Sequence, residues 1–216
     1  MPPLPKIAGE RKVELPARLA RLAAETEVLV VGGGPAGLGA AVGAAKAGAS
    51  VVLVERYGFL GGHATVALVM PLASFHTSHP NPVQTGGATL FPTDHGPGQP
   101  VIAGALKEFL ERLVMAGGAI PPSLDTGYVV PFDPEIFKLT ALQWLDSVGV
   151  KYLFHAQASG VLGSGRLEGV ILETKSGPLL VKARTVSSVA QLTGLLNRNS
   201  LSPLASMAPT GLPSLY

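Results

Sequence analysis

The stretch VLVVGGGPAGLGAAVGAAKAGASVVLVER, residues 28–56, decides what kind of fold this chain adopts. A short apolar run at 27–31 predicts a strand that is buried on both faces, and it leads into closely spaced glycines. Residues 35–47 predict a helix that stops at Gly48, and residues 50–54 predict a second buried strand. A strand, a helix and a strand in this order form a βαβ unit, so we expect parallel strands joined by a right-handed crossover.

The glycines of this stretch have the spacing that a dinucleotide site requires. Gly32 would allow a tight turn, Gly34 would let the backbone approach a pyrophosphate, and Gly37 would let the helix pack closely on the strand. The start of the helix would then offer free N–H groups to the phosphates. Glu55 ends the second strand, where a carboxylate accepts hydrogen bonds from ribose hydroxyls and disfavours the 2′-phosphate of NADP. Glycines that serve only helix–strand packing are the alternative; the agreement of strand, spacing and acid favours a site for an ADP moiety.

Composition limits what the rest of the chain can be. The 216 residues suffice for one α/β domain, and 47% hydrophobic against 14% charged residues indicate a globular protein. Because there is no cysteine, disulfides, thiolate metal sites and redox-active cysteine pairs are excluded. A net charge of +2 without a Lys/Arg cluster predicts no nucleic-acid partner. Neither a secretory signal nor a long apolar run is apparent, so we expect a cytoplasmic protein with no membrane partner.

Downstream of the βαβ unit, the pattern predicts loops, two helices and further strands. Residues 57–100 form a loop-rich excursion; loops of such length are usually functional or disordered, and the apolar content and the lack of charged residues over 57–93 favour a functional loop. Helical spacing returns at 101–116, and a second helix is expected over 132–149, with Asp133 as its N-cap before Pro134. A third strand is expected at 150–155. Three short strands, at 159–162, 167–174 and 179–183, predict an antiparallel meander.

Two segments flank this predicted domain, which spans residues 25–186. Residues 1–24 are a lead-in, in which 15–24 are expected to form a short helix with Leu15, Leu19 and Leu22 on one face. Residues 187–216 contain no acid and a single base, Arg198, and their leucines follow no steady period. We therefore predict no defined fold for this divergent tail.

A second glycine pair, Gly61 and Gly62, follows Glu55 in the run RYGFLGGHAT. The sequence from residue 28 to this run resembles the FAD-dependent oxidoreductases of the glutathione reductase structural class, which are typified by GGGPAG…ER.GFLGG.AT. FDPE, GVKYLFHAQASGVL and LEGVILETKSGPLLVKARTV resemble that family's downstream helix, third strand, meander and fourth strand. The resemblance covers about residues 25–186. It implies an α/β fold, a Rossmann-type three-layer FAD-binding domain with a parallel sheet and a small antiparallel β-meander.

The same resemblance implies a set of cofactor-binding residues and a function. It places the following residues on FAD: Gly32, Gly34, Pro35, Ala36 and Gly37 on the pyrophosphate, Glu55 on the adenosine ribose, Arg56 beside the adenine, Gly61 and Gly62 along the pyrophosphate and ribityl chain, and the backbone of Ala158 against the adenine. A solvated Arg56 and an ordinary turn at the glycine pair are the alternatives. The implied function is an FAD-dependent oxidoreductase whose flavin accepts hydride or electrons from an unidentified small molecule.

The family pattern breaks after residue 186. In the family the next strand runs into ATG, often followed by DGD, and this segment closes over the FAD pyrophosphate. Here SSVAQLTG follows instead, so we expect a truncated or frame-shifted chain end, weak FAD binding and poor turnover. A catalytically silent nucleotide-binding fragment and an NAD-binding dehydrogenase are the alternative hypotheses.

The histidines supply the remaining candidates for chemistry. His63 follows the second glycine pair and could act near a flavin, although an exposed loop histidine is the simpler interpretation. His76, His79 and His95 include an HxxH spacing, but no helix frames the pair, and we expect no metal site. No catalytic residue can be assigned. Phe137 and Trp144 are expected in the core of the second predicted helix.

Overall fold

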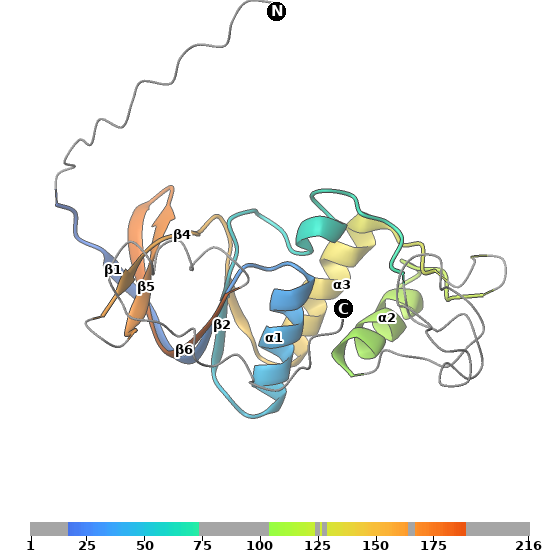
Figure 1. Ribbon diagram of the computed structural model, residues 1–216, viewed down its shortest axis with the longest axis horizontal. Coiled ribbons are helices and arrows are strands. Elements are labelled where there is room, and N and C mark those ends of the chain that lie inside the picture. Colours follow the sequence, from blue (N-terminus) through green and yellow to red (C-terminus); the bar gives the residue numbers. More distant parts are fainter. Residues whose placement is uncertain (1–16, 74–103, 124–125, 127–128, 164–166, 189–216) are drawn as a thin grey trace, which may run out of the picture.

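The βαβ unit expected from the glycine-rich stretch is the centre of the fold (Figure 1). The computed structural model describes residues 17–73, 104–123, 126, 129–163 and 167–188. Its elements, in chain order, are β1 (Arg21–Val31), α1 (Pro35–Lys46), β2 (Val51–Val54), the 3₁₀ helix η1 (Gly62–Ala64), α2 (Ala105–Met115), α3 (Pro134–Ser147), β3 (Lys151–Leu153), β4 (Gln157–Leu162), β5 (Gly169–Thr174) and β6 (Gly177–Ser188).

All the described strands belong to one mixed sheet with the order β3-β2-β1-β6-β5-β4. β1 pairs in parallel with β2, from Val28 opposite Val51 to Val31 opposite Val54, and β2 pairs in parallel with β3. The meander β4-β5-β6 is antiparallel. Both the parallel crossover and the meander therefore confirm the α/β fold predicted from the sequence.

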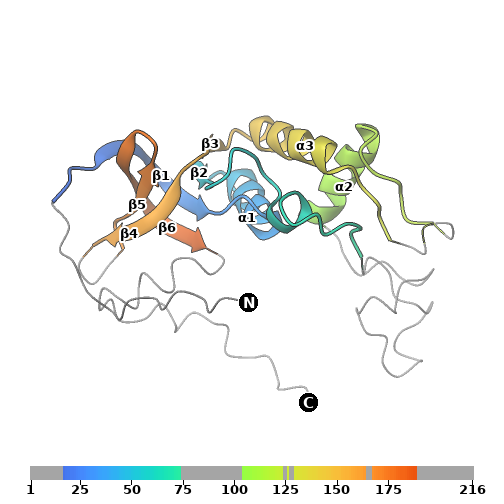
Figure 2. The same ribbon diagram turned by 90° about the horizontal axis from the view of Figure 1, so that it is seen from above.

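The side chains of β1 and β2 alternate between two cores because successive residues of a strand point to opposite faces. Val30 and Leu53 pack toward the helices, in one core with Leu38, Ala41 and Trp144. Their neighbours in the two strands form a second core on the other face with residues of the meander; its members include Leu29, Val31, Val52, Val54, Val170, Leu172 and Val181. Helices, parallel strands and meander thus form three layers (Figure 2).

The prediction of a helix over residues 15–24 is wrong for residues 17–24, which are the part of this segment that the structure describes. Arg21–Ala24 belong to β1, which pairs in parallel with β6 from Arg21 opposite Leu179 to Val31 opposite Ser188. A helix here would need a surface on which to bury its leucine face, but Leu19 is 96% exposed and Leu22 is 48% exposed. Pairing with β6 instead satisfies the backbone of this segment. Leu15 lies outside the described residues.

β6 is longer than the strand expected at 179–183. Its first half pairs with β5, and its second half continues along β1 as far as Ser188. The strand therefore serves both the meander and the parallel part of the sheet. The rest of the predicted tail, residues 189–216, lies outside the described residues, as does the part of the loop-rich excursion from 74 onward.

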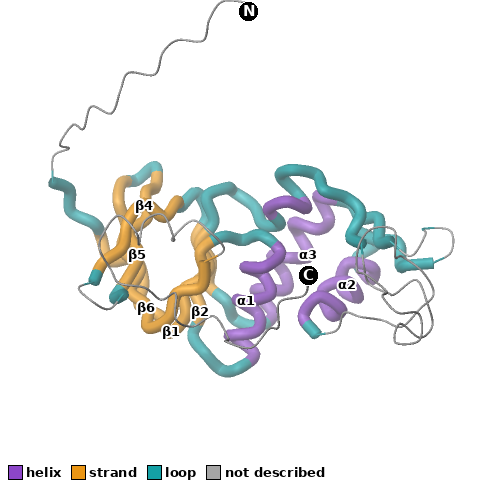
Figure 3. Tube along the Cα trace, in the orientation of Figure 1, coloured by secondary structure: helices purple, strands orange, loops and turns teal. Residues whose placement is uncertain are grey.

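Three helices pack together beside the sheet (Figure 3). α3 begins as predicted, because the Asp133 carboxylate accepts hydrogen bonds from the N–H groups of Glu135 (2.7 Å) and Ile136 (3.0 Å). Phe137 and Trp144 are buried, as expected. In the described residues no helix has the length and apolar character needed to cross a bilayer.

One carboxylate connects the three helices. Glu108 of α2 accepts a hydrogen bond from the indole of Trp144 on α3 at 3.0 Å, and it pairs with Lys46 of α1. Arg112 lies one turn further along α2, with Nη2 at 3.2 Å from the same carboxylate. The pKa of Glu108 is lowered to about 2. The largest cause is the hydrogen bond from Lys46, and the next is the hydrogen bond from Trp144.

Candidate functional site

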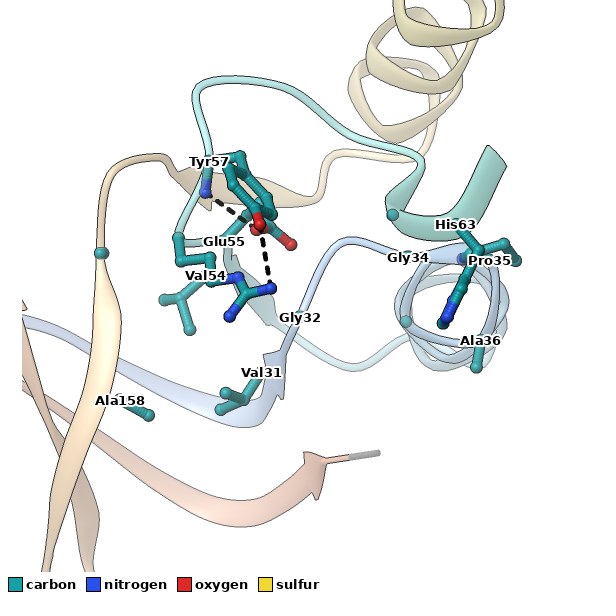
Figure 4. A pocket seen from close by; sticks show the side chains of 14 residues that line it. Val31, Gly32, Gly34, Pro35, Ala36, Val54, Glu55, Tyr57, His63 and Ala158 are labelled. Atoms are coloured by element: carbon teal, nitrogen blue, oxygen red, sulfur yellow. Dashed lines mark hydrogen bonds between the residues drawn. The ribbon is translucent and has the colours of Figure 1, made fainter. Parts of the chain in front are cut away.

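A cavity of about 250 Å³ opens at the carboxyl ends of β1 and β2 (Figure 4). Its lining residues are Val31, Gly32, Gly34, Pro35, Ala36, Gly37, Val54, Glu55, Arg56, Tyr57, Gly62, His63, Ala156 and Ala158. The structure therefore brings together every cofactor residue predicted from the sequence except Gly61. In parallel sheets, ligands bind beyond the carboxyl ends of the strands, where the chain leaves in opposite directions.

The first glycine loop holds the end of β1 against the end of β2 and the start of α1. The N–H of Gly32 donates to the Val54 carbonyl at 2.8 Å, and Gly32 has φ +105, which favours glycine. At Gly37 a Cβ atom would overlap the Gly32 carbonyl oxygen, so α1 can begin this close to the strand only with glycine there. The positive φ of Gly32 and the lack of room for a Cβ atom at Gly37 explain why the motif has glycine at these two positions.

The start of α1 carries backbone donors that find no acceptor in the part of the chain that the structure describes. Gly34 is the N-cap residue and supplies no side-chain cap, and Pro35 has no N–H. The first helical hydrogen bond is from the N–H of Leu38 to the Gly34 carbonyl, so the N–H groups of Ala36 and Gly37 have no acceptor among the described residues. These two donors and the positive end of the helix dipole lie at the cavity.

Glu55 is 7% exposed, and its carboxylate joins the two loops that follow β1 and β2. Oε2 accepts a hydrogen bond from the N–H of Gly33 at 2.6 Å, and Oε1 accepts one from the N–H of Tyr57 at 2.9 Å. Each carboxylate oxygen has two lone-pair sites, so both can accept a further hydrogen bond from a ligand. Glu55 is therefore both a structural clamp and an available acceptor at the cavity.

The second glycine pair lies directly against the first glycine loop. The N–H of Gly61 donates to the Gly33 carbonyl at 2.9 Å, and a Cβ atom at Gly62 would come within 3.0 Å of the Gly34 Cα. Gly61 and Gly62 both have positive φ, of 113° and 49°. Gly62 lines the cavity, whereas Gly61 does not line it and instead is hydrogen-bonded to the first loop. The pair is a turn, and this turn belongs to the site.

Arg56 and Tyr57 line the cavity and contact each other, and Ala156 and Ala158 line it as well. The Arg56 guanidinium lies over the Tyr57 ring, 4.7 Å from its centroid, and Nη2 donates to the Tyr57 hydroxyl at 3.0 Å. Arg56 is exposed yet held in place by its neighbour. Ala156 and Ala158 are buried, and each presents only a methyl group as its side chain to the cavity.

Sequence reasoning missed four lining residues, Val31, Val54, Tyr57 and Ala156. Val31 and Val54 are the last residues of β1 and β2, so strand ends at a dinucleotide motif are the signal that could have found them. Ala156 lies two residues before Ala158. Tyr57 carried no signal of its own, because its role follows from the hydrogen bond that its N–H donates to Glu55 and the one that its hydroxyl accepts from Arg56.

His63 lies on η1, is exposed, and lines the cavity beside the start of α1 (Figure 4). Its position agrees with the simpler interpretation of an exposed histidine and also places it at the candidate site. His76, His79 and His95 lie outside the described residues. Within the described ranges, no group of three or more His, Cys, Asp or Glu side chains is arranged to hold a metal ion.

The fold and the site together define a dinucleotide-binding protein of the Rossmann type. The family model described as FAD dependent oxidoreductase matches residues 27–187, which is most of the chain. The chain therefore belongs to the FAD-dependent oxidoreductase family, and its cofactor is FAD. No curated protein sequence matches the chain.

Several solved structures resemble this chain, and the first one described here, with a TM-score above 0.5, supports the fold. THI4 from Thermovibrio ammonificans is 19% identical with a TM-score of 0.51, and the alignment covers 82% of this chain and 63% of that protein. A 3-ketosteroid-Δ4-(5α)-dehydrogenase from Rhodococcus jostii is 20% identical with a TM-score of 0.47, over 78% of this chain and 48% of that one. The p-nitrophenol 4-monooxygenase PnpA from Pseudomonas putida is 16% identical with a TM-score of 0.49, over 80% and 44%. This chain thus spans less than two thirds of the length of each of these proteins.

Proposed function

We propose that the cavity at the ends of β1 and β2 binds the ADP half of FAD, and that the chain acts as an FAD-dependent oxidoreductase on a small molecule. The observation that carries this proposal is the contact between the two glycine loops beside unpaired donors of α1. Gly61 donates to Gly33, Gly62 lies against Gly34, and the N–H groups of Ala36 and Gly37 have no protein acceptor among the described residues.

The chemistry of the lining suits a pyrophosphate at the start of α1. The two backbone donors without an acceptor in the described segments, together with the positive end of the helix dipole, favour an anion there. Gly34 and Gly62 present no side chain to the cavity, so a phosphate can approach the backbone. Because FAD is not a compact ligand, we infer that it binds in an extended pose along the two loops.

The other end of the cavity suits an adenosine. The Glu55 carboxylate retains lone pairs that can accept hydrogen bonds from ribose hydroxyls. The Arg56 guanidinium, held over Tyr57, and the small side chain of Ala158 would flank an adenine ring. A carboxylate at this point repels a 2′-phosphate, which supports FAD over any NADP-like ligand.

When bound, FAD supplies the redox chemistry, since its flavin ring accepts hydride or electrons from a substrate. The residues of this chain bind the cofactor and orient its ADP half, and the glycines among them leave room for the phosphates beside the backbone. The substrate of this proposed activity is a small molecule.

The test is an FAD titration followed by flavin fluorescence and absorption, with two matched glycine variants. In Gly34→Ala the new methyl group has room in the protein, because its nearest atom is the Gly62 Cα at 3.8 Å, but it projects where the pyrophosphate would lie. We expect FAD affinity to fall about tenfold or more, since overpacking of one methyl group costs about 1–3 kcal/mol.

Gly43→Ala is the control, because a Cβ atom there meets nothing within 4 Å and the residue lies on the exposed side of α1. It should bind FAD as the unchanged chain does and gain about 0.5–1 kcal/mol of stability from the alanine. The proposal fails if the unchanged chain gives no perturbed flavin spectrum, or if Gly34→Ala and Gly43→Ala bind FAD equally well.

A further inference from the structure

Thr65 is a buried side chain next to the cavity that does not line it. It is 5% exposed and directly follows η1. Its hydroxyl donates a hydrogen bond to the Leu60 carbonyl at 2.7 Å, and its own N–H donates to the Gly62 carbonyl at 3.1 Å. Both ends of the turn that contains the second glycine pair are therefore tied to this one residue.

The Thr65 side chain also occupies the space that a side chain at Gly61 would need. A Cβ atom at Gly61 would overlap Thr65 Cγ2 and would lie 2.5 Å from Thr65 Oγ1. Gly61 has φ +113, so the turn depends on glycine for its backbone conformation as well as for room. Thr65 thus packs on the backbone of the turn at the point where the turn meets the first glycine loop.

Two contacts connect the turn that contains Gly61 and Gly62 to the first glycine loop at the cavity. The N–H of Gly61 donates to the Gly33 carbonyl at 2.9 Å, and Leu60, which is 1% exposed, fills the space beside Gly33. Gly62 follows at once and stands against Gly34 in the cavity lining. A shift of the Leu60 carbonyl would move both glycine loops relative to each other.

We propose that Thr65 is a positioning residue for the cofactor, which sets the separation of the two glycine loops at the phosphates and the ribityl chain without touching the ligand. This inference rests on the proposed function. Its physical basis is the hydroxyl bond to Leu60: a methyl group cannot approach a carbonyl oxygen as closely as a hydroxyl, so Thr65→Val must open the turn and leave the Leu60 carbonyl unpaired.

The experiment measures the FAD affinity and the thermal stability of the full chain in three variants. Thr65→Val removes the hydroxyl and keeps the shape, whereas Thr65→Ser keeps the hydroxyl. Val170→Ala is the matched control for general destabilisation, because Val170 is fully buried in the core on the other face of the sheet. AMP, which carries the adenosine but neither the second phosphate nor the ribityl chain, is titrated in parallel by NMR.

We expect Thr65→Val to weaken FAD binding by about tenfold, because the displaced turn no longer holds Gly62 at its place beside Gly34, with AMP affinity little changed. Thr65→Ser should bind FAD within about twofold of the unchanged chain, because the hydrogen bond is retained. Val170→Ala should lower the melting temperature and leave FAD affinity unchanged. If Thr65→Val does not fold, Thr65→Ala, which introduces no clash, replaces it with the same expectation.

The inference is overturned if Thr65→Val binds FAD as tightly as the unchanged chain, or if FAD and AMP affinities fall together in both Thr65→Val and Val170→Ala. A different result separates it from the proposed function. If the unchanged chain itself does not bind FAD, the proposed function fails first, and the role of Thr65 in cofactor positioning fails with it.

Discussion

At the scale of single residues, Glu55 shows how one side chain can be part of the fold and of the candidate site at once. Its two oxygens accept hydrogen bonds from the N–H groups of Gly33 and Tyr57, which belong to the loops after β1 and β2. A glutamine has one acceptor oxygen and one donor group at the same positions, so Glu55→Gln must leave one of these N–H groups without a partner.

We therefore predict that Glu55→Gln lowers the free energy of unfolding of the cofactor-free chain by about 1–3 kcal/mol. It should also weaken FAD binding, because the same carboxylate is proposed to hold the ribose. Urea unfolding and FAD titration measure the two effects. Glu173→Gln serves as control, since Glu173 pairs with Arg18 on the surface and should change neither quantity appreciably. Unchanged stability in Glu55→Gln would show that the two backbone bonds contribute nothing.

Most of the cavity residues that sequence reasoning found, apart from Glu55 and Arg56, are those whose role depends on backbone geometry. Gly32 has a positive φ and Gly37 has no room for a Cβ atom, and both demands restrict the residue type enough to leave a visible pattern. Sequence reasoning did not identify Thr65 and Tyr57, because threonine and tyrosine occur in many structural roles, and only the fold shows their hydrogen-bond partners. A local sequence pattern indicates where the backbone conformation restricts the residue type. It does not show which backbone groups a side chain contacts in the folded protein.

At the scale of elements, the packing of the three helices depends on the ionised Glu108. Lys46, Trp144 and Arg112 surround this carboxylate, and the bonds from Lys46 and Trp144 hold its pKa at about 2, below the ordinary value of 4.5. A carboxyl group whose pKa is lowered in the folded state stabilises the fold above its unfolded pKa and loses this contribution as pH falls toward the folded pKa.

We predict that the difference in unfolding free energy between the chain and Glu108→Gln is constant above about pH 5 and disappears between about pH 4.5 and pH 2. Its size should be about 1 kcal/mol at most, because the group is partly exposed and the glutamine can still accept the bond from Trp144. Urea unfolding at a series of pH values measures it. A difference that persists at pH 2 would mean that the ion pairs do not stabilise the helix packing.

Element prediction from the sequence succeeded where an element has signals at both ends. α1 has glycine before it and Gly48 after it, and α3 has its Asp133 cap, so both were placed within a few residues. The segment 15–24 lacked such signals, and its leucines repeat at a spacing that fits a helix face. Pairing with β6, which lies more than 150 residues away in the chain, decided its conformation instead. That non-local contact is invisible in a local pattern.

At the scale of the whole molecule, the site lies where the two halves of the sheet meet. β1 is central, with β2 and β3 on one side and the meander on the other, and both cores converge on its last residues, Val30 and Val31. A ligand at the end of β1 therefore contacts elements that pack on both faces. Binding there should stabilise the entire folded unit, and it can be measured by melting the chain.

The proposed binding mode makes a distinction between parts of the cofactor that melting can test. Because a ligand that binds only the folded state adds about 2.7 kcal/mol of stability at 100 times its dissociation constant, FAD at that concentration should raise the melting temperature by about 5–10 °C. ADP at the same concentration as FAD should also raise the melting temperature, by an amount that its own affinity sets, since the cavity described here is proposed for the ADP half. FMN, which lacks the adenosine, has no partner for Glu55 or Arg56 and should give a much smaller rise at the same concentration as FAD.

Gly34→Ala should reduce the effect of FAD and ADP together, whereas Gly43→Ala should preserve both. If FMN stabilised the chain as much as FAD while ADP did nothing, the cavity at the end of β1 would not be the adenosine site, and the assignment of Glu55 and Arg56 would have to be abandoned.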